Sequence, residues 1–281
     1  MPELPEVETV RRGLTPAMEG RVIERLTLNR ADLRFPFPDR FKERVEGARV
    51  TRMGRYAKFL ITELDTGEAL IMHLGMTGRF TINADPTAEF HHDPGTYAAH
   101  DHVIFTMQGG ATVTYNDVRR FGFMELWPTD DMQNYPRLKA MGPEPLSNRF
   151  NADYLSEALR GKHTPIKAAL LDQSVIAGLG NIYVCEALFR SGISPRRKAS
   201  TIPGARAERL APAINAVIAE AIEAGGSSIS DFASASGDLG YFQHGFAVYD
   251  RTGEPCKTCD GQIKRIVQSG RSSFFCGACQ R

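Results

Sequence analysis

The sequence predicts an α+β protein built from several domains, and three observations lead to this fold class. Residues 5–18 follow a helical pattern, residues 21–127 break into short runs rich in β-branched and aromatic side chains, and residues 151–224 return to helical spacing. Four cysteines in two close pairs follow near the C-terminal end. Strands followed by helices are typical of α+β proteins or of separate domains, and 281 residues suffice for two or more.

Composition and charge narrow the class of protein. Hydrophobic residues make up 42% and charged residues 24%, which is typical of a globular chain rather than a disordered or fibrous one. No apolar run reaches the length of a membrane span and no secretory leader is visible, so we expect no membrane partner and a cytoplasmic location. The net charge of +1 indicates no polyanionic partner by itself. Residues 251–281, however, carry six basic and two acidic side chains, which favours either a polyanion-binding surface or a solvated basic face.

The N-terminal stretch Met1-Pro2-Glu3-Leu4-Pro5-Glu6 precedes and begins the first expected helix. A proline in the first turn suits a helix start, and apolar residues recur on one face of the segment. If Met1 is removed, Pro2 carries a free secondary amine, which can attack the C1′ carbon of an opened sugar to give an iminium. On these residues alone, a short polar lead into a helix is the simpler explanation of the stretch.

The middle of the chain predicts an antiparallel sandwich or barrel. The expected strands are Val22–Leu28, Arg49–Met53, Tyr56–Leu64, Ala69–Leu74, His102–Met107, Ala111–Tyr115 and Phe121–Trp127. Residues 82–99 read as a long loop, and residues 225–245, rich in Gly, Ser and Ala, as a mobile one. The expected helices beyond the proline-rich linker are 151–160, 165–172, 181–190 and 206–224. The expected domains are 1–130, a linker over 131–150, 151–245 and 246–281.

The cysteine spacing is the most specific local signal. Cys256 and Cys259 form one Cys-x2-Cys pair, and Cys276 and Cys279 form a second one sixteen residues later. Two such pairs can close a tetrahedral four-thiolate site around Zn²⁺, and four protein ligands leave no open position, so this zinc should be structural. Disulfides or an iron–sulfur site are the alternatives. The remaining cysteine, Cys185, is expected to be a buried small residue on a helix.

Several weaker motifs each allow a structural and a functional interpretation. Asn181 follows two glycines at a helix start, which is typical of a phosphate site or of an ordinary capped turn. Arg119 and Phe121 occupy a turn that could enter a DNA groove or simply be solvated. Met76 lies on a turn flanked by glycines, and Lys58 lies among apolar strand residues, where it could point to the solvent.

These motifs occur together and in order over nearly the whole chain, and in this combination the sequence resembles the bacterial formamidopyrimidine-DNA glycosylase family. The residues that carry the resemblance are 2–9, 57–58, 73–78, 100–103, 117–122, 142–146, 178–183 and the four cysteines. The resemblance implies an N-terminal helix plus antiparallel β-sandwich, a helix–two-turns–helix domain with a lesion-recognition loop at about 225–245, and a C-terminal four-cysteine zinc finger.

The resemblance also implies an activity and a set of site residues. The activity is that of a bifunctional DNA glycosylase and abasic-site lyase of base-excision repair, acting as a monomer on oxidised purines in double-stranded DNA, at the bacterial nucleoid. Pro2 would be the nucleophile, Glu3 would move the proton that opens the sugar, and Lys58 and Arg271 would assist β- and δ-elimination. The residues implied to contact DNA are His100, Arg119, His163, Asn181, Met76 and Phe121.

Two positions depart from the family pattern, and two rival functions remain open. His163 stands where a Lys or Arg is usual, with Lys162 and Lys167 as candidate substitutes, and Val118 stands where a turn proline is usual. One rival is an endonuclease VIII-like glycosylase for oxidised pyrimidines, against which Leu4 argues. The other is a non-catalytic protein that binds damaged DNA, against which the retained Pro2 argues.

Overall fold

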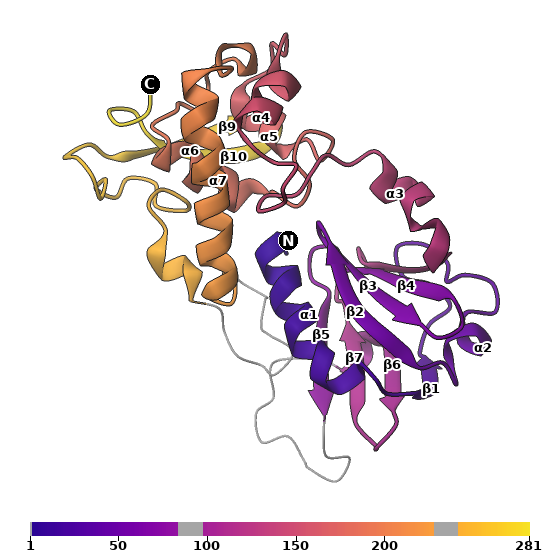
Figure 1. Ribbon diagram of the computed structural model, residues 1–281. Helices are drawn as coiled ribbons and strands as arrows, with labels where there is room; N and C mark the ends of the chain where they lie inside the picture. Colours follow the sequence, from indigo (N-terminus) through magenta and orange to yellow (C-terminus); the bar gives the residue numbers. More distant parts are fainter. Residues whose placement is uncertain (1, 84–97, 228–240) are drawn as a thin grey trace. The chain divides into compact units, whose positions relative to one another are not determined.

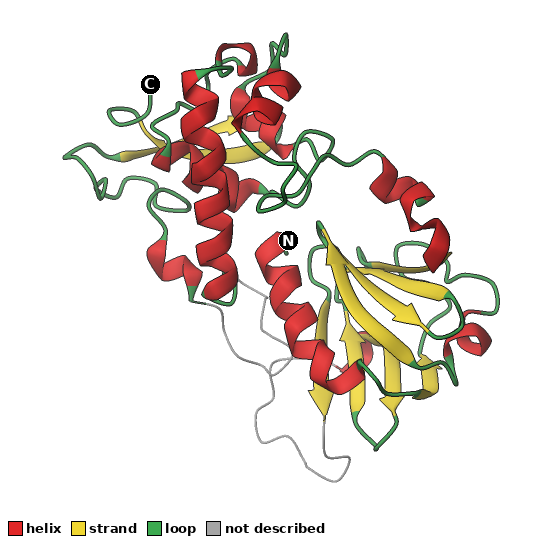
Figure 2. Cartoon of the chain, in the orientation of Figure 1, coloured by secondary structure: helices red, strands yellow, loops and turns green. Residues whose placement is uncertain are grey.

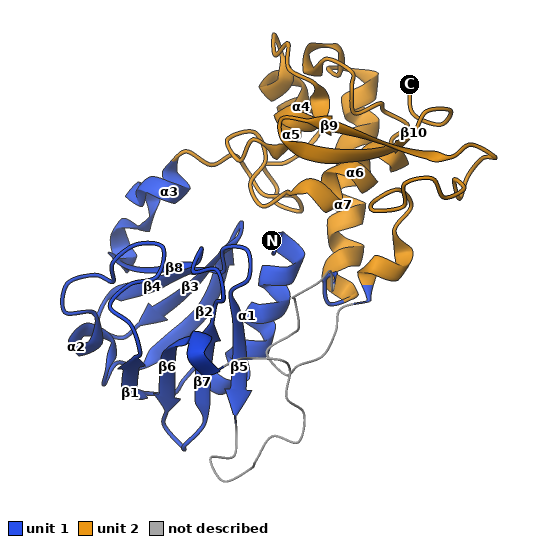
Figure 3. Cartoon of the chain, turned by 180° about the vertical axis from the view of Figure 1, so that it is seen from behind, with its two compact units in different colours: residues 1–139, 225–241 blue, residues 140–224, 242–281 orange. Residues whose placement is uncertain are grey.

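The computed structural model describes residues 2–83, 98–227 and 241–281, and Figure 1 labels its helices and strands where there is room. The chain divides into two compact units, coloured separately in Figure 3. Unit 1 contains residues 1–139 and 225–241, and unit 2 contains residues 140–224 and 242–281. The polypeptide therefore passes from unit 1 to unit 2, returns to unit 1 for one short segment, and ends in unit 2.

Unit 1 is a β-sandwich, which decides between the two β architectures that the sequence allows. Its two antiparallel sheets, drawn in yellow in Figure 2, have the strand orders β2-β3-β4-β8 and β1-β6-β7-β5. The strands are β1 (Ile23–Leu28), β2 (Val50–Tyr56), β3 (Phe59–Leu64), β4 (Glu68–His73), β5 (Arg79–Asn83), β6 (Asp101–Met107), β7 (Thr112–Asn116) and β8 (Phe123–Pro128). Short elements α2 (Phe41–Val45) and η1 (Ala98–His100) join them.

The first helix, α1 (Leu4–Met18), shares one hydrophobic core with both sheets. Val7, Val10, Leu14 and Met18 are at most 1% exposed and pack with the inward-facing residues of the strands. Burial of each such side chain stabilises the fold by about 1.5–3 kcal/mol, before entropy is counted. The expected helix is confirmed, and this packing fixes the N-terminus of the chain against the sandwich.

The register of the β2-β3-β4-β8 sheet places three turns at the same end of its strands. Phe59 of β3 lies opposite His73 of β4, and His73 lies opposite Phe123 of β8. The β2–β3 turn precedes Phe59, a glycine-flanked turn follows His73, and the turn after β7 precedes Phe123. The stacked rings of His73 and Phe123, with centroids 5.2 Å apart, hold this row together. The sheet therefore brings together turns that are far apart in sequence.

The proline-rich segment after β8 is more ordered than a plain linker. It contains η2 (Thr129–Asn134) and α3 (Pro136–Lys139), both in unit 1. Arg137 forms an ion pair with Glu125 of β8 at 2.7 Å, and its guanidinium lies 4.4 Å from the centre of the Phe123 ring. The helix was not predicted, because it is short and the segment contains four prolines, which obscure any helical periodicity. The bounds of the expected domains stay a prediction.

Unit 2 combines helices with a C-terminal hairpin. Its elements are α4 (Ala152–Leu159), α5 (Ile166–Leu171), α6 (Asn181–Arg190), η3 (Ala199–Thr201), α7 (Ala205–Glu223), η4 (Phe242–Gly245), β9 (Ile263–Gln268) and β10 (Arg271–Cys276). All four expected helices are confirmed to within a residue or two. Glu186 of α6 is 1% exposed and accepts backbone N–H bonds of 2.8–3.0 Å from Ala247, Val248 and Tyr249, which fixes the segment that precedes the hairpin to α6.

Three sequence expectations need correction or lie outside the described residues. The run Tyr56–Leu64 is not one strand, because a turn at Ala57-Lys58 separates β2 from β3. Residues 82 and 83, expected in a loop, end strand β5, whereas residues 84–97 and most of the 225–245 loop lie outside the described residues. Within the described chain, no helix is both long and apolar enough to span a bilayer.

Candidate functional site

The N-terminal residues are fixed by hydrogen bonds at the start of α1. Glu3 is the N-cap residue and forms a capping box with Glu6: the Glu3 backbone N–H donates to Glu6 Oε2 at 2.9 Å, and the Glu3 carboxylate accepts the backbone N–H of Glu6. Both carboxylates are at most 3% exposed, and Pro2 is also buried. The positive end of the helix favours carboxylates here. The chain thus begins on a pre-ordered pair of acids.

Glu6 also holds a second segment. Its Oε1 accepts the backbone N–H of Ser227 at 2.8 Å and the Ser227 hydroxyl at 2.9 Å. A Cβ atom on the preceding residue, Gly226, would lie 3.1 Å from Glu6 Oε1, so the backbone there passes close to the acid. The Glu-x-x-Glu spacing from Glu3 could have indicated the capping box, but no local signal indicates the partner at residue 227.

Lys58 lies in the two-residue turn between β2 and β3, not on a strand as expected. Ala57 has φ 53°, an unusual left-handed conformation for alanine, and its carbonyl accepts a 3.0 Å hydrogen bond from Arg55 Nη1. Lys58 is only 7% exposed. Arg55 Nε donates in turn to Glu8 of α1 at 3.0 Å. This chain of contacts fixes the Lys58 turn to the helix that carries Glu3.

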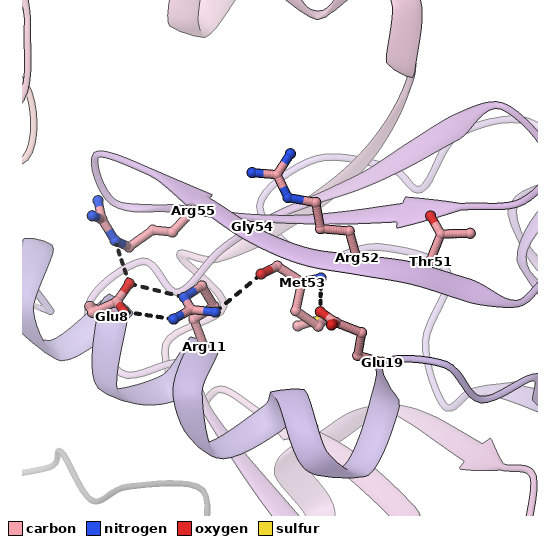
Figure 4. Close-up of a pocket in the computed structure, with 8 residues that line it drawn as sticks. All are labelled: Glu8, Arg11, Glu19, Thr51, Arg52, Met53, Gly54 and Arg55. Carbon is pink, nitrogen blue, oxygen red and sulfur yellow. Dashed lines mark hydrogen bonds and ion pairs between the residues drawn. The ribbon is translucent and has the colours of Figure 1, made fainter.

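A pocket of about 560 Å³ lies where these contacts meet, between α1 and β2 (Figure 4). Burial raises the pKa of the Glu8 carboxyl, but hydrogen bonds from Arg11, Arg12 and Arg55 outweigh it and lower the pKa to about 2. Arg11 also donates to the Met53 carbonyl at 3.2 Å. The arginines that line the pocket are paired with acids. The clearest role of these side chains is therefore to join the helix to the sheet.

His73 is a half-buried base that lies between the Lys58 turn and the Met76 turn. Burial, followed by the positive charges of Lys58, Arg34 and Arg137, lowers its pKa to about 4. Its Nδ1 accepts the Gly75 N–H at 3.0 Å, which requires an unprotonated nitrogen. The neutral imidazole of His73 is therefore the form that holds the Met76 turn.

The implied gap-filling residues lie together on two turns of unit 1. Met76 and Phe121 are 39% and 41% exposed, which is unusual for apolar side chains beside a well-packed core. The Arg119 guanidinium lies over the Phe121 ring, 4.6 Å from its centre. His100 ends η1 nearby in the fold, and its carbonyl accepts the Asp117 N–H at 3.1 Å. This arrangement presents two apolar tips and one cation to the exterior.

In unit 2, the residues around Ser272 bring two predicted site residues together. Asn181 begins α6, and its Nδ2 donates to the Ser272 carbonyl at 2.9 Å. Arg271, the neighbour of Ser272 at the start of β10, is exposed. An amide nitrogen carries two hydrogens, and this hydrogen bond uses one of those of Asn181.

The basic residues expected to replace a cation at position 163 are not equivalent. Lys167 is fully buried and donates to the same Ser272 carbonyl at 3.1 Å, so it supports the hairpin and is not available to a phosphate. His163 is exposed on the turn before α5. The segments 162–164 and 197–200 are joined by backbone hydrogen bonds, so Lys162 and Lys198 are its basic neighbours in the fold.

The four cysteines form one cluster, with all four sulfur atoms within 4.8 Å of one another. Cys256 and Cys279 Sγ are 3.9 Å apart, and Cys259 and Cys276 Sγ are 3.5 Å apart. A tetrahedron of sulfurs at the usual zinc distance has edges of about 3.8 Å. The N–H groups of Thr258 and Gly261 donate to Cys256 and Cys259 sulfurs at 3.4 Å. The donor set and its spacing fit one zinc ion.

Three family models match successive parts of the chain. The model described as the formamidopyrimidine-DNA glycosylase N-terminal domain matches residues 1–124, and the model of the H2TH domain of the same glycosylase matches residues 141–233. A model described as a zinc finger found in FPG and IleRS matches residues 253–281. Together with the sulfur geometry, this match identifies the four cysteines as a structural zinc site.

Full-length relatives and solved structures agree with these matches. A formamidopyrimidine-DNA glycosylase of Ruegeria pomeroyi is 59% identical, with both chains covered completely. The crystal structure of a Thermus thermophilus MutM (FPG) protein is 39% identical with a TM-score of 0.85, covering 99% of this chain and 98% of that one. A Lactococcus lactis Fpg in complex with abasic-site DNA is 34% identical with a TM-score of 0.88, covering 99% of both chains.

Proposed function

Because the chain belongs to the formamidopyrimidine-DNA glycosylase family, we propose that it removes oxidised purines, such as 8-oxoguanine and formamidopyrimidines, from double-stranded DNA and then cuts the abasic strand. The observation that carries the proposal is the Pro2-Glu3 pair, buried on a capping box within a full-length match of 59% identity. The activity is that of a DNA-formamidopyrimidine glycosylase and abasic-site lyase in base-excision repair.

Pro2 is the proposed nucleophile. After Met1 is removed, its secondary amine attacks C1′ of the damaged nucleotide, the C1′–N bond to the base breaks, and an iminium forms. Glu3 moves the proton that opens the sugar ring. The buried position of Glu3 and the hydrogen bond from its backbone to Glu6 support this role, because a proton carrier must be held within hydrogen-bond reach of its target.

Lys58 and Arg271 are proposed to serve the strand-cutting steps. Loss of a C2′ proton from the iminium breaks the C3′–O bond, and a further elimination breaks the C5′–O bond. Lys58 assists the first elimination and Arg271 the second, and each cation also contacts a phosphate. The fixed turn of Lys58 and the support of Ser272, next to Arg271, suit groups that must be held in place.

The remaining site residues are proposed to bind and open the duplex. Met76, Arg119 and Phe121 fill the gap left by the everted nucleotide, and Arg119 faces the orphaned cytosine. His100, His163 and Asn181 contact the DNA backbone. The exposed apolar tips and the cation over the Phe121 ring support the gap-filling role. When zinc is bound, its four thiolate bonds cross-link the hairpin that carries Arg271.

Two finer statements belong to the same proposal. We place the chain as a monomer, because every proposed catalytic group comes from a single copy, and in the bacterial cytoplasm, at the nucleoid where its substrate lies. An endonuclease VIII-like specificity for oxidised pyrimidines is the alternative enzyme function. A non-catalytic damaged-DNA-binding role is the alternative without chemistry.

A panel of damaged duplexes, scored separately for base release and strand scission, tests the proposal. We expect release of 8-oxoguanine and of a formamidopyrimidine, followed by loss of both sugar–phosphate bonds. Faster action on thymine glycol or 5-hydroxycytosine would instead establish the pyrimidine specificity. Tight binding to damaged duplexes with neither base release nor scission would establish the non-catalytic role.

A further inference from the structure

The two turns that carry the exposed gap-filling residues are in direct backbone contact. Gly75 lies before Met76, and a Cβ atom built on it would be 2.3 Å from the Phe121 carbonyl carbon and 2.4 Å from the Gly122 nitrogen. No side chain fits at this position without moving the neighbouring turn. A Cβ on Gly122 would be 2.7 Å from the His73 carbonyl oxygen. The turns 74–78 and 117–122 are therefore packed against each other as closely as their backbones allow.

A single buried carboxylate joins these turns. Asp117 is fully buried, and its Oδ1 accepts a hydrogen bond from the Thr77 hydroxyl, beside Met76. Its Oδ2 accepts the Gly122 N–H at 2.8 Å, beside Phe121. Thr77 Oγ1 in turn accepts the Arg119 N–H at 3.1 Å. One carboxylate and one hydroxyl thus hold the backbone next to each of the three gap-filling side chains.

Tyr115 closes this network from inside the sandwich. Its hydroxyl donates to Asp117 Oδ2 at 3.2 Å. Burial first, and then the charge and hydrogen bond of Asp117, raise the pKa of Tyr115 well above its usual range, so the phenol keeps its proton as a donor. The donors from Tyr115, Thr77 and Gly122 compensate for the loss of water around a buried carboxylate. Such a network specifies one arrangement of the groups that it joins.

We propose that Asp117 and Thr77 are positioning residues that make Met76, Arg119 and Phe121 act as one rigid wedge. Asp117 is fully buried, so it acts through the backbone of its neighbours and not on DNA. The Thr77 hydroxyl acts through its bonds to Asp117 and to the Arg119 N–H. The inference rests on the proposed function, because a fixed wedge matters where a nucleotide must be everted. The consequence of this positioning is selectivity for the opposite base, because the position of Arg119 relative to the orphaned base depends on the Thr77 hydroxyl in a different turn.

The variant that tests the role is Thr77→Val, which removes the hydroxyl with little change in volume. Thr77→Ser keeps the hydroxyl and is the rescue variant, and Thr81→Val, on the adjoining strand β5, is the matched control. Each variant is assayed under single-turnover conditions on 8-oxoguanine opposite cytosine, 8-oxoguanine opposite adenine, and a preformed abasic site. The abasic site carries no base to evict, so it reports the lyase chemistry with less dependence on the wedge.

We expect Thr77→Val to lower the rate constant on 8-oxoguanine opposite cytosine about tenfold, the effect of one lost hydrogen bond in a buried network. The preference for cytosine over adenine should shrink, and abasic-site cleavage should stay within about twofold of wild type. Thr77→Ser and Thr81→Val should retain the wild-type values. In an Arg119→Ala background, Thr77→Val should have little further effect, because the two changes act on one contact.

Each other outcome overturns the proposal. A folded Thr77→Val chain with wild-type rates and selectivity would show that the hydroxyl does not position the wedge. Equal losses on lesion and abasic DNA, or a fully additive effect with Arg119→Ala, would indicate a general structural role. A wild-type chain that cuts none of the three substrates would overturn the proposed function, and the positioning role with it.

Discussion

The two units fix their functional groups by different means. Unit 1 holds Glu3, Lys58 and the wedge through a capping box, a buried carboxylate and a core shared by a helix and two sheets. In unit 2, the hairpin that carries Arg271 packs on a small cluster containing Val248, Ile263 and Phe274 with cysteines. So small an apolar cluster supplies little stability, and a metal cross-link compensates. The difference teaches that the two units should fail under different conditions.

Loss of zinc should give the largest difference in stability between the two units. Removing the metal by chelation, or one ligand by Cys276→Ser, should unfold the hairpin, because structural zinc contributes about 10 kcal/mol or more to such folds. DNA binding should be lost, whereas the sandwich should keep its cooperative thermal transition. Zinc content, circular dichroism and a DNA-binding titration check this. Unchanged DNA affinity in zinc-free Cys276→Ser would break the comparison.

Acid should weaken unit 1 through His73. The pKa of His73 is lowered to about 4 in the folded state, below the ordinary histidine value of about 6.5, so the unfolded chain binds the proton more tightly. Stability that is fully present above pH 6.5 is therefore lost as the pH falls towards 4, by about 3 kcal/mol in total.

Denaturant unfolding of unit 1 as a function of pH measures this effect. His73→Asn can still accept the Gly75 N–H but does not titrate. In this variant, the loss of unfolding free energy between pH 6.5 and 4 that His73 causes should disappear. An identical pH dependence for the variant and the wild type would exclude His73 as the responsible group.

Glu6→Gln should produce a smaller loss that is confined to unit 1. The amide keeps one acceptor, but its NH₂ group faces donors from Ser227 or from Glu3, so one contact is lost at about 1–3 kcal/mol. Glycosylase and lyase rates should both fall, while zinc content and affinity for undamaged DNA remain. Glu24→Gln, an exposed residue of β1, is the control. A loss of zinc with Glu6→Gln would contradict the separation of the units.

The smallest expected effect is a gain at Val118. Val118 is the second residue of a turn closed by the Arg120 N–H to the Asp117 carbonyl at 3.2 Å, and its side chain is 51% exposed. Proline suits this turn position, so Val118→Pro should stabilise unit 1 by about 0.4–1 kcal/mol. The lesion rate should change little if the network around Asp117 already fixes the turn. A decrease in melting temperature would show that the backbone here does not fit proline.

The sequence predicted what depends on local spacing. The cysteine pairs specified the metal site, and helical periodicity specified α1 and the helices of unit 2. The Lys58 turn escaped prediction because neither Ala57 nor Lys58 is a residue typical of turns, although Ala57 adopts a φ of 53°. Asp117 and Lys167 escaped for a different reason: their roles depend on partners 40 and 105 residues away, at Thr77 and Ser272, which no local pattern reveals.

Covalent catalysis by the amine of Pro2 is the central claim, and trapping tests it directly. The chain with Met1 removed is incubated with an 8-oxoguanine duplex and borohydride, and the cross-linked peptide is located by mass spectrometry. We predict a single adduct on the Pro2 nitrogen, and none from a preparation that retains Met1 yet binds the same duplex. An adduct on Lys58 or another lysine, or equal trapping by the Met1-retaining chain, would contradict the account.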